Sequence, residues 1–333
     1  MNGEPHWHQL SERTSTAGIR LLVWCCRRLG FGFFRAAALP VLFFYWLSSA
    51  RLRAVLSDYQ RRVRGFARLH PECVHASDRL ASAIHSGKTG APAALAHLER
   101  FAEALLDKFI VLAGLEIPSR RLALEIEGAD IFAADGPEDG CIILTSHSGC
   151  QELLSARSAE ATDHELVVLQ YTLHAERFNT LLRSAGAKPA NICFFEVGRL
   201  TPALAMELSE RVERGAYVVL AGDRTPVASD LTAAVDFLGA TARFPTGGAL
   251  LALLLKRPLR MMTCTRLQPD PRDPSRARYR VRFVSLDEAP QAPRGAREAW
   301  LSAKTADYAK ALEREIAESP EDWFNFFDFW SKK

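Results

Sequence analysis

The chain has 333 residues, of which 48% are hydrophobic and 24% are charged, with 20 Gly and 17 Pro. This length and composition are those of a folded protein with a sizeable core, and they exclude collagen-like, coiled-coil and low-complexity classes. The seven cysteines form no C-x-x-C pair and no Cys/His cluster at zinc-ligand spacing. We therefore expect reduced thiols and no metal site.

The formal net charge of +3 hides an uneven distribution. Residues 1–70 carry eleven Arg against three acidic residues, a net charge of +8, while the other 263 residues carry 31 basic and 36 acidic side chains, a net charge of −5. The basic excess surrounds the most apolar stretch, residues 19–46. A basic and apolar segment favours a membrane surface, not nucleic acid, as the partner.

The apolar stretch is interrupted by Arg27, Arg28 and Arg35. Its uninterrupted runs are shorter than the roughly 20 apolar residues that span a bilayer. Short apolar helices flanked by Arg and aromatic rings favour a segment that lies in, or dips into, the cytoplasmic leaflet, and Pro40 suits a bend there. A buried helical hairpin and a secretory signal are the alternatives.

Downstream, the spacing of apolar residues predicts helices over 54–69 and 92–115. From residue 121 on, short β-rich runs alternate with helical segments, which is typical of an α/β sheet with helices on its faces. The expected strands are 122–126, 141–145, 166–170, 192–195, 217–221, 260–265 and 279–286.

These patterns divide the chain into two parts. Residues 1–53 form the predicted basic and apolar membrane-associated helical segment, and residues 54–333 form an α/β domain. Within the domain we expect a helical lead-in over 54–120, a catalytic core over 121–290, and a C-terminal helix with an aromatic tail over 291–333.

The first loop with candidate chemistry follows the expected strand 141–145 and reads TSHSGCQE. The chemistry of open α/β sheets collects beyond the carboxyl ends of strands. Glu152, five residues after His147, can accept a hydrogen bond from the imidazole, fix its tautomer and stabilise the imidazolium. Because about one of the nine His has such a spacing by chance, the strand, loop and helix setting carries the prediction. A capping or core histidine is the alternative.

The second loop, in YVVLAGDRTPV, brings Asp223 and Arg224 to the end of strand 217–221. The carboxylate suits support of His147, and the guanidinium suits a phosphate or an acyl carbonyl, with a local ion pair as the alternative. Further on, Gly247 and Gly248 begin an apolar helix whose free N–H groups suit an anion or an oxyanion, or simply cap the helix.

Five ordered blocks resemble the late acyltransferases of lipid A biosynthesis, within the lysophospholipid acyltransferase superfamily. The resemblance runs from about residue 6 to residue 330. The blocks are HWHQLSERTSTAGIRLLVWCCRRLGFGFFRAAALPVLFFYW, TSHSGCQE, GAYVVLAGDRTP, ARFPTGGALLAL and PEDWFNFFDFW.

The resemblance implies a mixed central sheet and an enzyme at the cytoplasmic face of the inner membrane. Such an enzyme moves a fatty acyl group from an acyl-carrier-protein or coenzyme A thioester onto a hydroxyl or amine of a lipid or glycolipid, without a metal or other cofactor. His147 would be the general base, Glu152 its partner and Asp223 a second carboxylate. The resemblance also places Arg224 near the active centre. Together with it, the candidate substrate-binding residues are Thr246, Gly247, Gly248 and Arg199.

One block departs from the family pattern. Lipid A enzymes commonly show a Pro-Asp-Gln-Asp type of run where this chain has GDRTP. The departure points away from Kdo-lipid A as the acceptor and toward the branch associated with aryl polyene and other specialised envelope lipids. A glycerolipid, phosphatidylinositol mannoside or ornithine lipid acceptor, and a non-catalytic factor for envelope assembly, are the alternatives.

Overall fold

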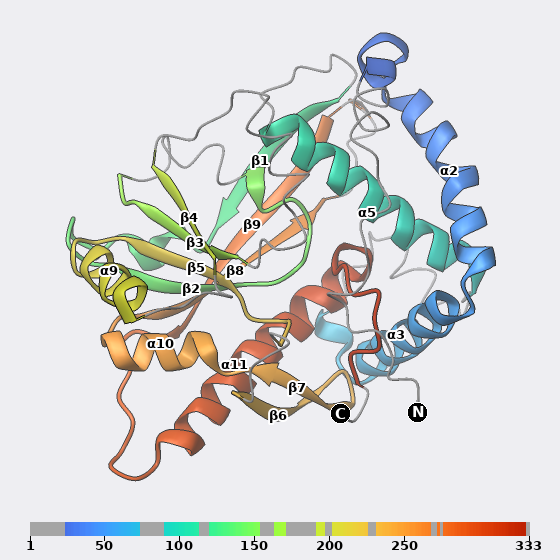
Figure 1. Ribbon diagram of the computed structural model, residues 1–333. Coiled ribbons are helices and arrows are strands. Elements are labelled where there is room, and N and C mark those ends of the chain that lie inside the picture. The colour runs from blue at the N-terminus through green and yellow to red at the C-terminus, as the bar shows by residue number, and fades with distance from the viewer. Residues whose placement is uncertain are drawn as a thin grey trace.

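The computed structural model describes residues 24–73, 90–112, 120–153, 163–170, 191–196, 202–225, 231–267, 272–273 and 276–330. Its centre is a seven-stranded sheet of order β1-β9-β8-β2-β5-β3-β4 (Figure 1). Each predicted strand is confirmed to within a few residues. The strands are β1 (Arg121–Glu127), β2 (Cys141–Thr145), β3 (Leu166–Gln170), β4 (Ile192–Glu196), β5 (Tyr217–Ala221), β8 (Leu259–Arg266) and β9 (Arg276–Asp287).

The sheet is mixed, as the sequence predicts. Strands β4, β3, β5, β2 and β8 run parallel to one another, whereas β9 is antiparallel to β8 and β1 is parallel to β9. The carboxyl ends of the five parallel strands therefore meet at one edge of the sheet, where the candidate loops begin.

Helices cover both faces of the sheet, because side chains of a buried strand alternate between two cores. In β2, Ile142 and Leu144 join the core beneath α9, α10 and α11, while Cys141 and Ile143 face the opposite core, against which α5 packs through Val111. The long helices are α2 (Phe31–Ser48), α3 (Ala50–Leu69), α5 (Ala91–Leu112), α9 (Pro202–Glu213), α10 (Gly247–Leu255) and α11 (Arg297–Glu318). Short 3-10 turns are η2 (Pro71–Cys73), η3 (Ala129–Phe132) and η5 (Pro320–Asp322).

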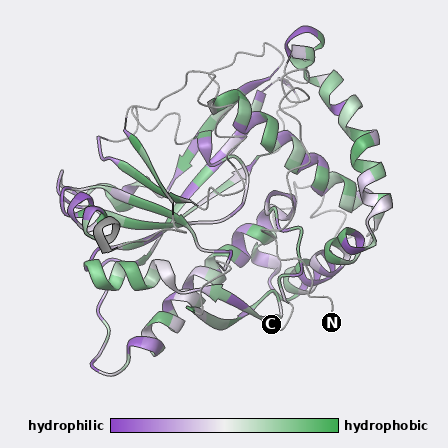
Figure 2. Ribbon diagram, viewed as in Figure 1, coloured by the Kyte–Doolittle hydropathy of each residue, from purple (hydrophilic) through white to green (hydrophobic). Residues whose placement is uncertain are grey.

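The N-terminal apolar segment differs from the expected series of short helices. Residues Phe31–Ser48 form one helix of 18 residues that contains Pro40, and by length and composition it is the one helix in the described ranges able to cross a membrane. Arg35 does not interrupt it, because its guanidinium pairs with Glu99 of α5 at 2.6 Å. Most of α2 is hydrophobic (Figure 2), yet Phe34 is its single buried residue. The predicted boundary at residue 53 falls inside α3, which begins at Ala50.

A hairpin that the sequence analysis did not predict lies outside the main sheet. Strands β6 (Thr232–Phe237) and β7 (Ala240–Pro245) pair antiparallel through a turn at Leu238 and Gly239. Both turn residues have positive φ, 49° and 78°. The turn is missed because Leu-Gly is not among the usual signals for such a turn, which strongly prefers Asn or Asp before the glycine.

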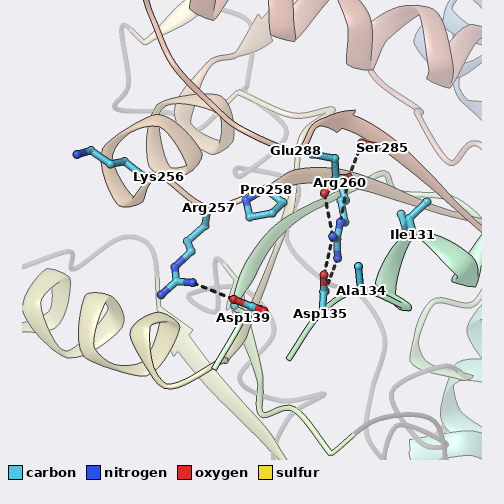
Figure 3. Close-up of a pocket in the computed structure, with 11 residues that line it drawn as sticks. Ile131, Ala134, Asp135, Asp139, Lys256, Arg257, Pro258, Arg260, Ser285 and Glu288 are labelled. Carbon is cyan, nitrogen blue, oxygen red and sulfur yellow. Dashed lines mark hydrogen bonds and ion pairs between the residues drawn. The ribbon is translucent and has the colours of Figure 1, made fainter. Parts of the chain in front are cut away.

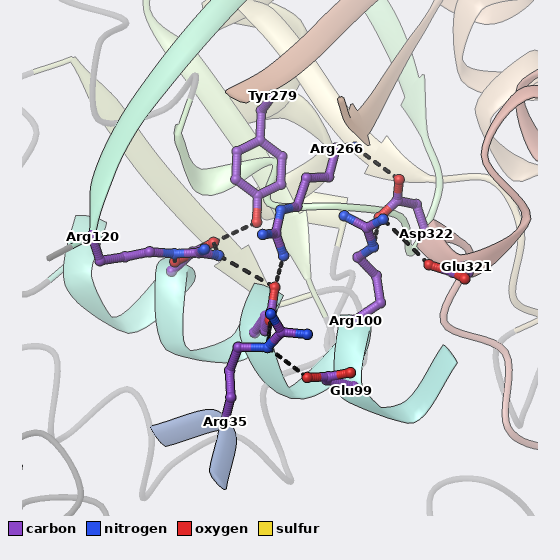
Figure 4. A network of polar contacts seen from close by, with 10 residues as sticks. Arg35, Glu99, Arg100, Arg120, Arg266, Tyr279, Glu321 and Asp322 are labelled. Carbon is purple, nitrogen blue, oxygen red and sulfur yellow. Dashed lines mark hydrogen bonds and ion pairs between the residues drawn. The ribbon is translucent and has the colours of Figure 1, made fainter. Parts of the chain in front are cut away.

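Buried charges tie α5 to the sheet and to the C-terminal tail (Figure 4). Arg120 bonds both carboxylate oxygens of Asp107, at 2.7 and 2.5 Å, and the Tyr279 hydroxyl donates to the same carboxylate at 2.6 Å. Arg100 reaches Glu321 of the tail at 3.2 Å. These contacts fix the position of α5 against β9 and the tail.

We expect Asp107→Ala to lower the free energy of unfolding by about 3–5 kcal/mol, because it removes the carboxylate that is hydrogen-bonded to the buried Arg120 guanidinium and leaves it the more distant Glu103, at 3.6 Å. The matched control is Asp58→Ala, which removes the partner of Arg61 and Arg62 on the surface of α3 and costs less than about 1 kcal/mol. Urea denaturation of both variants measures the difference. Equal losses of unfolding free energy in the two variants would show that the buried Asp107 pair stabilises the fold no more than a surface pair does.

Candidate active site

Strand register brings His147 and Asp223 together. Strands β2 and β5 are parallel neighbours in which Thr145 is paired with Ala221. His147 lies two residues beyond Thr145, and Asp223 lies two residues beyond Ala221, so the two side chains leave the same edge of the sheet side by side. The backbone N–H of Gly222 donates to the Thr145 carbonyl at 2.8 Å and extends the pairing past the strand ends.

The Asp223 carboxylate is the hydrogen-bond partner of the imidazole. His147 Nδ1 lies 2.7 Å from Asp223 Oδ1, and the His147 backbone N–H donates to Oδ2 at 2.8 Å. The indole Nε1–H of Trp323 donates to the same Oδ2 at 2.9 Å. Asp223 is 2% exposed, so these donors substitute for the water that a buried carboxylate loses.

Electrostatics set the protonation of the pair. Burial by itself raises the pKa of Asp223, but the charge and hydrogen bonds of His147 outweigh it and hold that pKa at about 2. Burial and the nearby Arg224 lower the pKa of His147 below its ordinary value, although Asp223 acts in the opposite direction. At neutral pH the carboxylate is therefore ionised and the imidazole neutral. Its Nδ1 carries the hydrogen bonded to Asp223, and Nε2 keeps a lone pair.

His147 lines a cleft of about 580 Å³ at the carboxyl edge of the sheet. Four charged or titratable side chains line it: His147, Arg224, Lys108 and Glu152. Much of the remaining wall is apolar, from the ends of β3 and β5, one face of α5 and the aromatic tail. These apolar residues are Phe101, Ala104, Leu105, Val168, Leu169, Val219, Leu220, Ala221, Phe324, Phe326 and Phe327.

The aromatic tail holds two of the site loops in place. The Phe324 N–H donates to the His147 carbonyl at 2.8 Å, and Arg224 Nη2 donates to the Phe324 carbonyl at 2.9 Å. The Arg224 guanidinium also lies over the ring of Phe327, 5.7 Å from its centroid. Arg224 is thereby directed along the wall of the cleft, near His147.

The predicted pairing of His147 with Glu152 is wrong. Among the described residues the imidazole bonds Asp223, while Glu152 pairs with Lys108, with Oε1 2.5 Å from Nζ. The reason is geometric: the spacing of five residues describes proximity along the chain, whereas the register of β2 and β5 decides which carboxylate meets the ring. Glu152 does line the same cleft.

The other candidates separate into two groups. Thr246, Gly247 and Gly248 do not line the cleft at His147. Gly248 instead lets α10 approach the sheet closely, because a Cβ there would lie 2.2 Å from Leu144 Cδ2. Arg199 lies outside the described residues.

Cys150, three residues after His147 and a possible alternative nucleophile, is fully buried. Burial raises the pKa of its thiol well above the ordinary value, so it stays protonated and packs in the core.

Sequence reasoning missed Trp323 and Lys108. Trp323 stands in the block PEDWFNFFDFW, whose aromatic residues signalled the tail, but nothing in that block indicates a hydrogen bond to a residue 100 positions earlier. Lys108 lies three residues after Leu105 on α5, and in the sequence it cannot be told from an ordinary polar residue of an amphipathic helix.

A second cavity, of about 600 Å³, lies at the opposite edge of the sheet (Figure 3). Gly140 and Pro258, which directly precede β2 and β8, line it. The buried Arg260 crosses it to Asp135 and Glu288, with nitrogen to oxygen distances of 2.5 and 2.9 Å. Arg260 is therefore paired within the wall of this cavity, which lies away from His147.

Comparison with known proteins identifies the C-terminal part of the chain. The family model described as bacterial lipid A biosynthesis acyltransferase matches residues 198–332, which include Asp223, Arg224 and Trp323. A search of curated proteins finds no match to the chain. Residues 198–332 are thus similar to the bacterial lipid A biosynthesis acyltransferases, and this match supports an acyltransferase of the lipid A type.

Proposed function

We propose that this acyltransferase moves a fatty or aryl polyene acyl group from an acyl-carrier-protein or coenzyme A thioester onto a hydroxyl or amine of a membrane lipid or glycolipid. The observation that carries the proposal is the bond between His147 Nδ1 and the buried Asp223, which leaves Nε2 as the basic nitrogen of a residue lining the cleft. Such a base serves acyl transfer directly, because an acceptor hydroxyl must lose its proton as it attacks.

The transfer runs in a ternary complex of enzyme, donor and acceptor. His147 Nε2 takes the proton of the acceptor hydroxyl while the oxygen attacks the thioester carbonyl carbon. The tetrahedral intermediate collapses with cleavage of the carbon–sulfur bond, and the departing thiolate takes the proton back from the imidazolium. Asp223 stays ionised throughout and stabilises the imidazolium. The mechanism uses no acyl-enzyme, metal or other cofactor.

Arg224 supplies positive charge where the carbonyl oxygen becomes an oxyanion. The guanidinium is held between the Phe324 carbonyl and the Phe327 ring, on the same cleft as His147. A fixed cation in a site shielded from water stabilises developing negative charge more strongly than solvent does. The apolar wall between α5, β3, β5 and the tail takes the acyl chain.

The enzyme works at the cytoplasmic face of the inner membrane. Helix α2 presents a row of exposed apolar side chains, among them Val41, Phe44 and Leu47, which are 65%, 71% and 55% exposed. Arg51 and Arg53 follow at the start of α3. An exposed apolar helix next to basic residues is the combination that binds an anionic membrane surface.

We expect His147→Ala to lower turnover by about 10²–10⁴-fold without unfolding the protein, since this is the usual contribution of a positioned general base. Mass spectrometry of envelope lipids from cells that lack the protein, complemented with wild type or variant, measures the acylated product. Cys150→Ala is the control and retains activity. Equal product from His147→Ala and wild type would disprove base catalysis, and an inactive Cys150→Ala with an acyl-thioester trapped on the wild type would favour a cysteine nucleophile.

We expect Arg224→Gln to shift the acidic limb of the kcat/KM profile to higher pH. The positive charge of Arg224 disfavours the imidazolium and lowers the pKa of His147; without it that pKa rises, so protonation inactivates the base at a higher pH. Arg257→Gln, at the second cavity, is the matched control and leaves the limb where it is. A shift to lower pH in Arg224→Gln would contradict this account of the site charge.

We expect Phe44→Glu to weaken binding to anionic phospholipid vesicles by about 10–100-fold, because it removes a large apolar contact and adds a negative charge. Leu254→Glu, on the exposed side of α10 (62% exposed), is the matched control. Co-sedimentation with vesicles measures both. If Phe44→Glu binds vesicles as well as wild type does, α2 does not bind the membrane.

A further inference from the structure

The cleft holds a charged pair that the chemistry of His147 leaves unexplained. Lys108 projects from α5, and Glu152 lies five residues beyond His147 at the end of the described loop, with Nζ and Oε1 2.5 Å apart. The two side chains are 34% and 27% exposed, and both line the cleft. A partly exposed Lys–Glu pair contributes little to stability, so the fold does not require it.

The wall of the cleft changes from aromatic to charged along α5, and the Lys108–Glu152 pair lies at the charged end. Phe101 of α5 packs against the rings of Phe324 and Phe326, with centroids 5.2 and 5.1 Å apart, so this end of the cleft is aromatic. Lys108 lies seven residues further along the same helix, about 10 Å along its axis. His147 belongs to both regions, because its carbonyl is bonded to Phe324 and its loop leads into Glu152. A substrate with an apolar and a polar part would place its polar part at Lys108.

We propose that Lys108 and Glu152 bind the hydroxylated head group of the acyl acceptor, next to the hydroxyl that His147 deprotonates. Lys108 donates hydrogen bonds to head-group oxygens, and Glu152 accepts them from neighbouring hydroxyls while holding Lys108 in the cleft. The proposal rests on the acyl-transfer function proposed above.

The chemistry of the pair favours hydroxyl groups as its ligands. An ammonium next to a carboxylate offers donors and acceptors side by side, which matches adjacent hydroxyls, whereas an isolated cation suits a phosphate. The positive charge of Lys108 also lowers the pKa of His147, which agrees with its closeness to the ring. Glu152 thus has two roles in the proposal, to accept from acceptor hydroxyls and to hold Lys108 in the cleft, and it is not the orienting partner of the imidazole.

The test separates acceptor binding from thioester chemistry by following two products at once. The full-length protein receives labelled palmitoyl-CoA and the total lipid extract of the native host. Transfer yields acylated lipid, and attack by water yields free palmitate. We expect Lys108→Met to lower the ratio of transfer to hydrolysis by about 10–100-fold and to raise the KM for the lipid extract, because a charged hydrogen bond to the acceptor is lost.

Conservative and paired variants distinguish a binding role from a structural one. Lys108→Arg restores part of the ratio, since it keeps a cationic donor. Glu152→Gln lowers the ratio less than Lys108→Met does, and the double variant loses less than the product of the two single effects, because both act on one interaction. Lys304→Met is the matched control: it removes a lysine paired with Asp287 and Asp307 on α11, outside the cleft, and leaves the ratio unchanged.

Three results would overturn the proposal. If Lys108→Met leaves the ratio of transfer to hydrolysis unchanged, the Lys108–Glu152 pair does not bind the acceptor. A higher KM for palmitoyl-CoA in place of the lipid extract makes Lys108 a contact for the donor phosphates. If the effects of the two single variants are additive, Glu152 and Lys108 do not act on one interaction. If the wild-type protein forms neither acylated lipid nor free palmitate, the acyl-transfer function itself is contradicted. This outcome differs from the three results above, in which the wild type is active.

Discussion

The site depends on one buried carboxylate, that of Asp223, and on the donors that keep it charged. Two of its hydrogen bonds come from His147 and the third from Trp323. A carboxylate at 2% exposure without such partners would bind a proton and could no longer stabilise an imidazolium. The register of β2 and β5 supplies the first two donors, and the C-terminal tail supplies the third. The catalytic geometry therefore requires both the sheet and the tail.

The tail is itself held by elements from distant parts of the chain. The Tyr59 hydroxyl of α3 donates to the Pro320 carbonyl at 2.6 Å, and His97 Nε2 of α5 lies 2.9 Å from the Trp323 carbonyl. Burial lowers the pKa of His97 to about 4, so this ring is neutral and stays hydrogen-bonded at physiological pH. From the site loop, Gly149 N–H donates to the Asp322 carbonyl at 3.0 Å. Helices α3 and α5, against which the apolar α2 packs, thus also support Trp323, and through it Asp223.

Periodicity predicted the framework well because strand burial is a local property. The run of β2 is buried throughout and apolar up to Thr145, which is typical of a strand covered on both faces, and His147 lies in the loop after it as predicted. The sequence analysis named Glu152 as the partner of His147 and Asp223 as a second carboxylate in support. The structure shows Asp223 in the first role, because strand pairing decides which carboxylate meets the ring and the spacing of five residues holds no information about strand pairing. Trp323 and Lys108 needed tertiary structure for the same reason. Arg35 was read as a break in the apolar segment because its partner Glu99 lies on a helix 64 residues away.

In the proposed mechanism, the opposing charges around His147 allow one residue to be a free base at rest and a stable acid during reaction. Asp223 alone would raise the pKa of the imidazole and leave part of it protonated before substrate binds. Burial and Arg224 offset that effect, so Nε2 is available at neutral pH. When the proton arrives, negative charge develops at the same time on the substrate carbonyl oxygen. The oxyanion then neutralises Arg224, the repulsion between Arg224 and the imidazolium falls, and the attraction of Asp223 remains. Under the proposed mechanism, the charges of the site therefore stabilise the charge-separated transition state more than the resting enzyme.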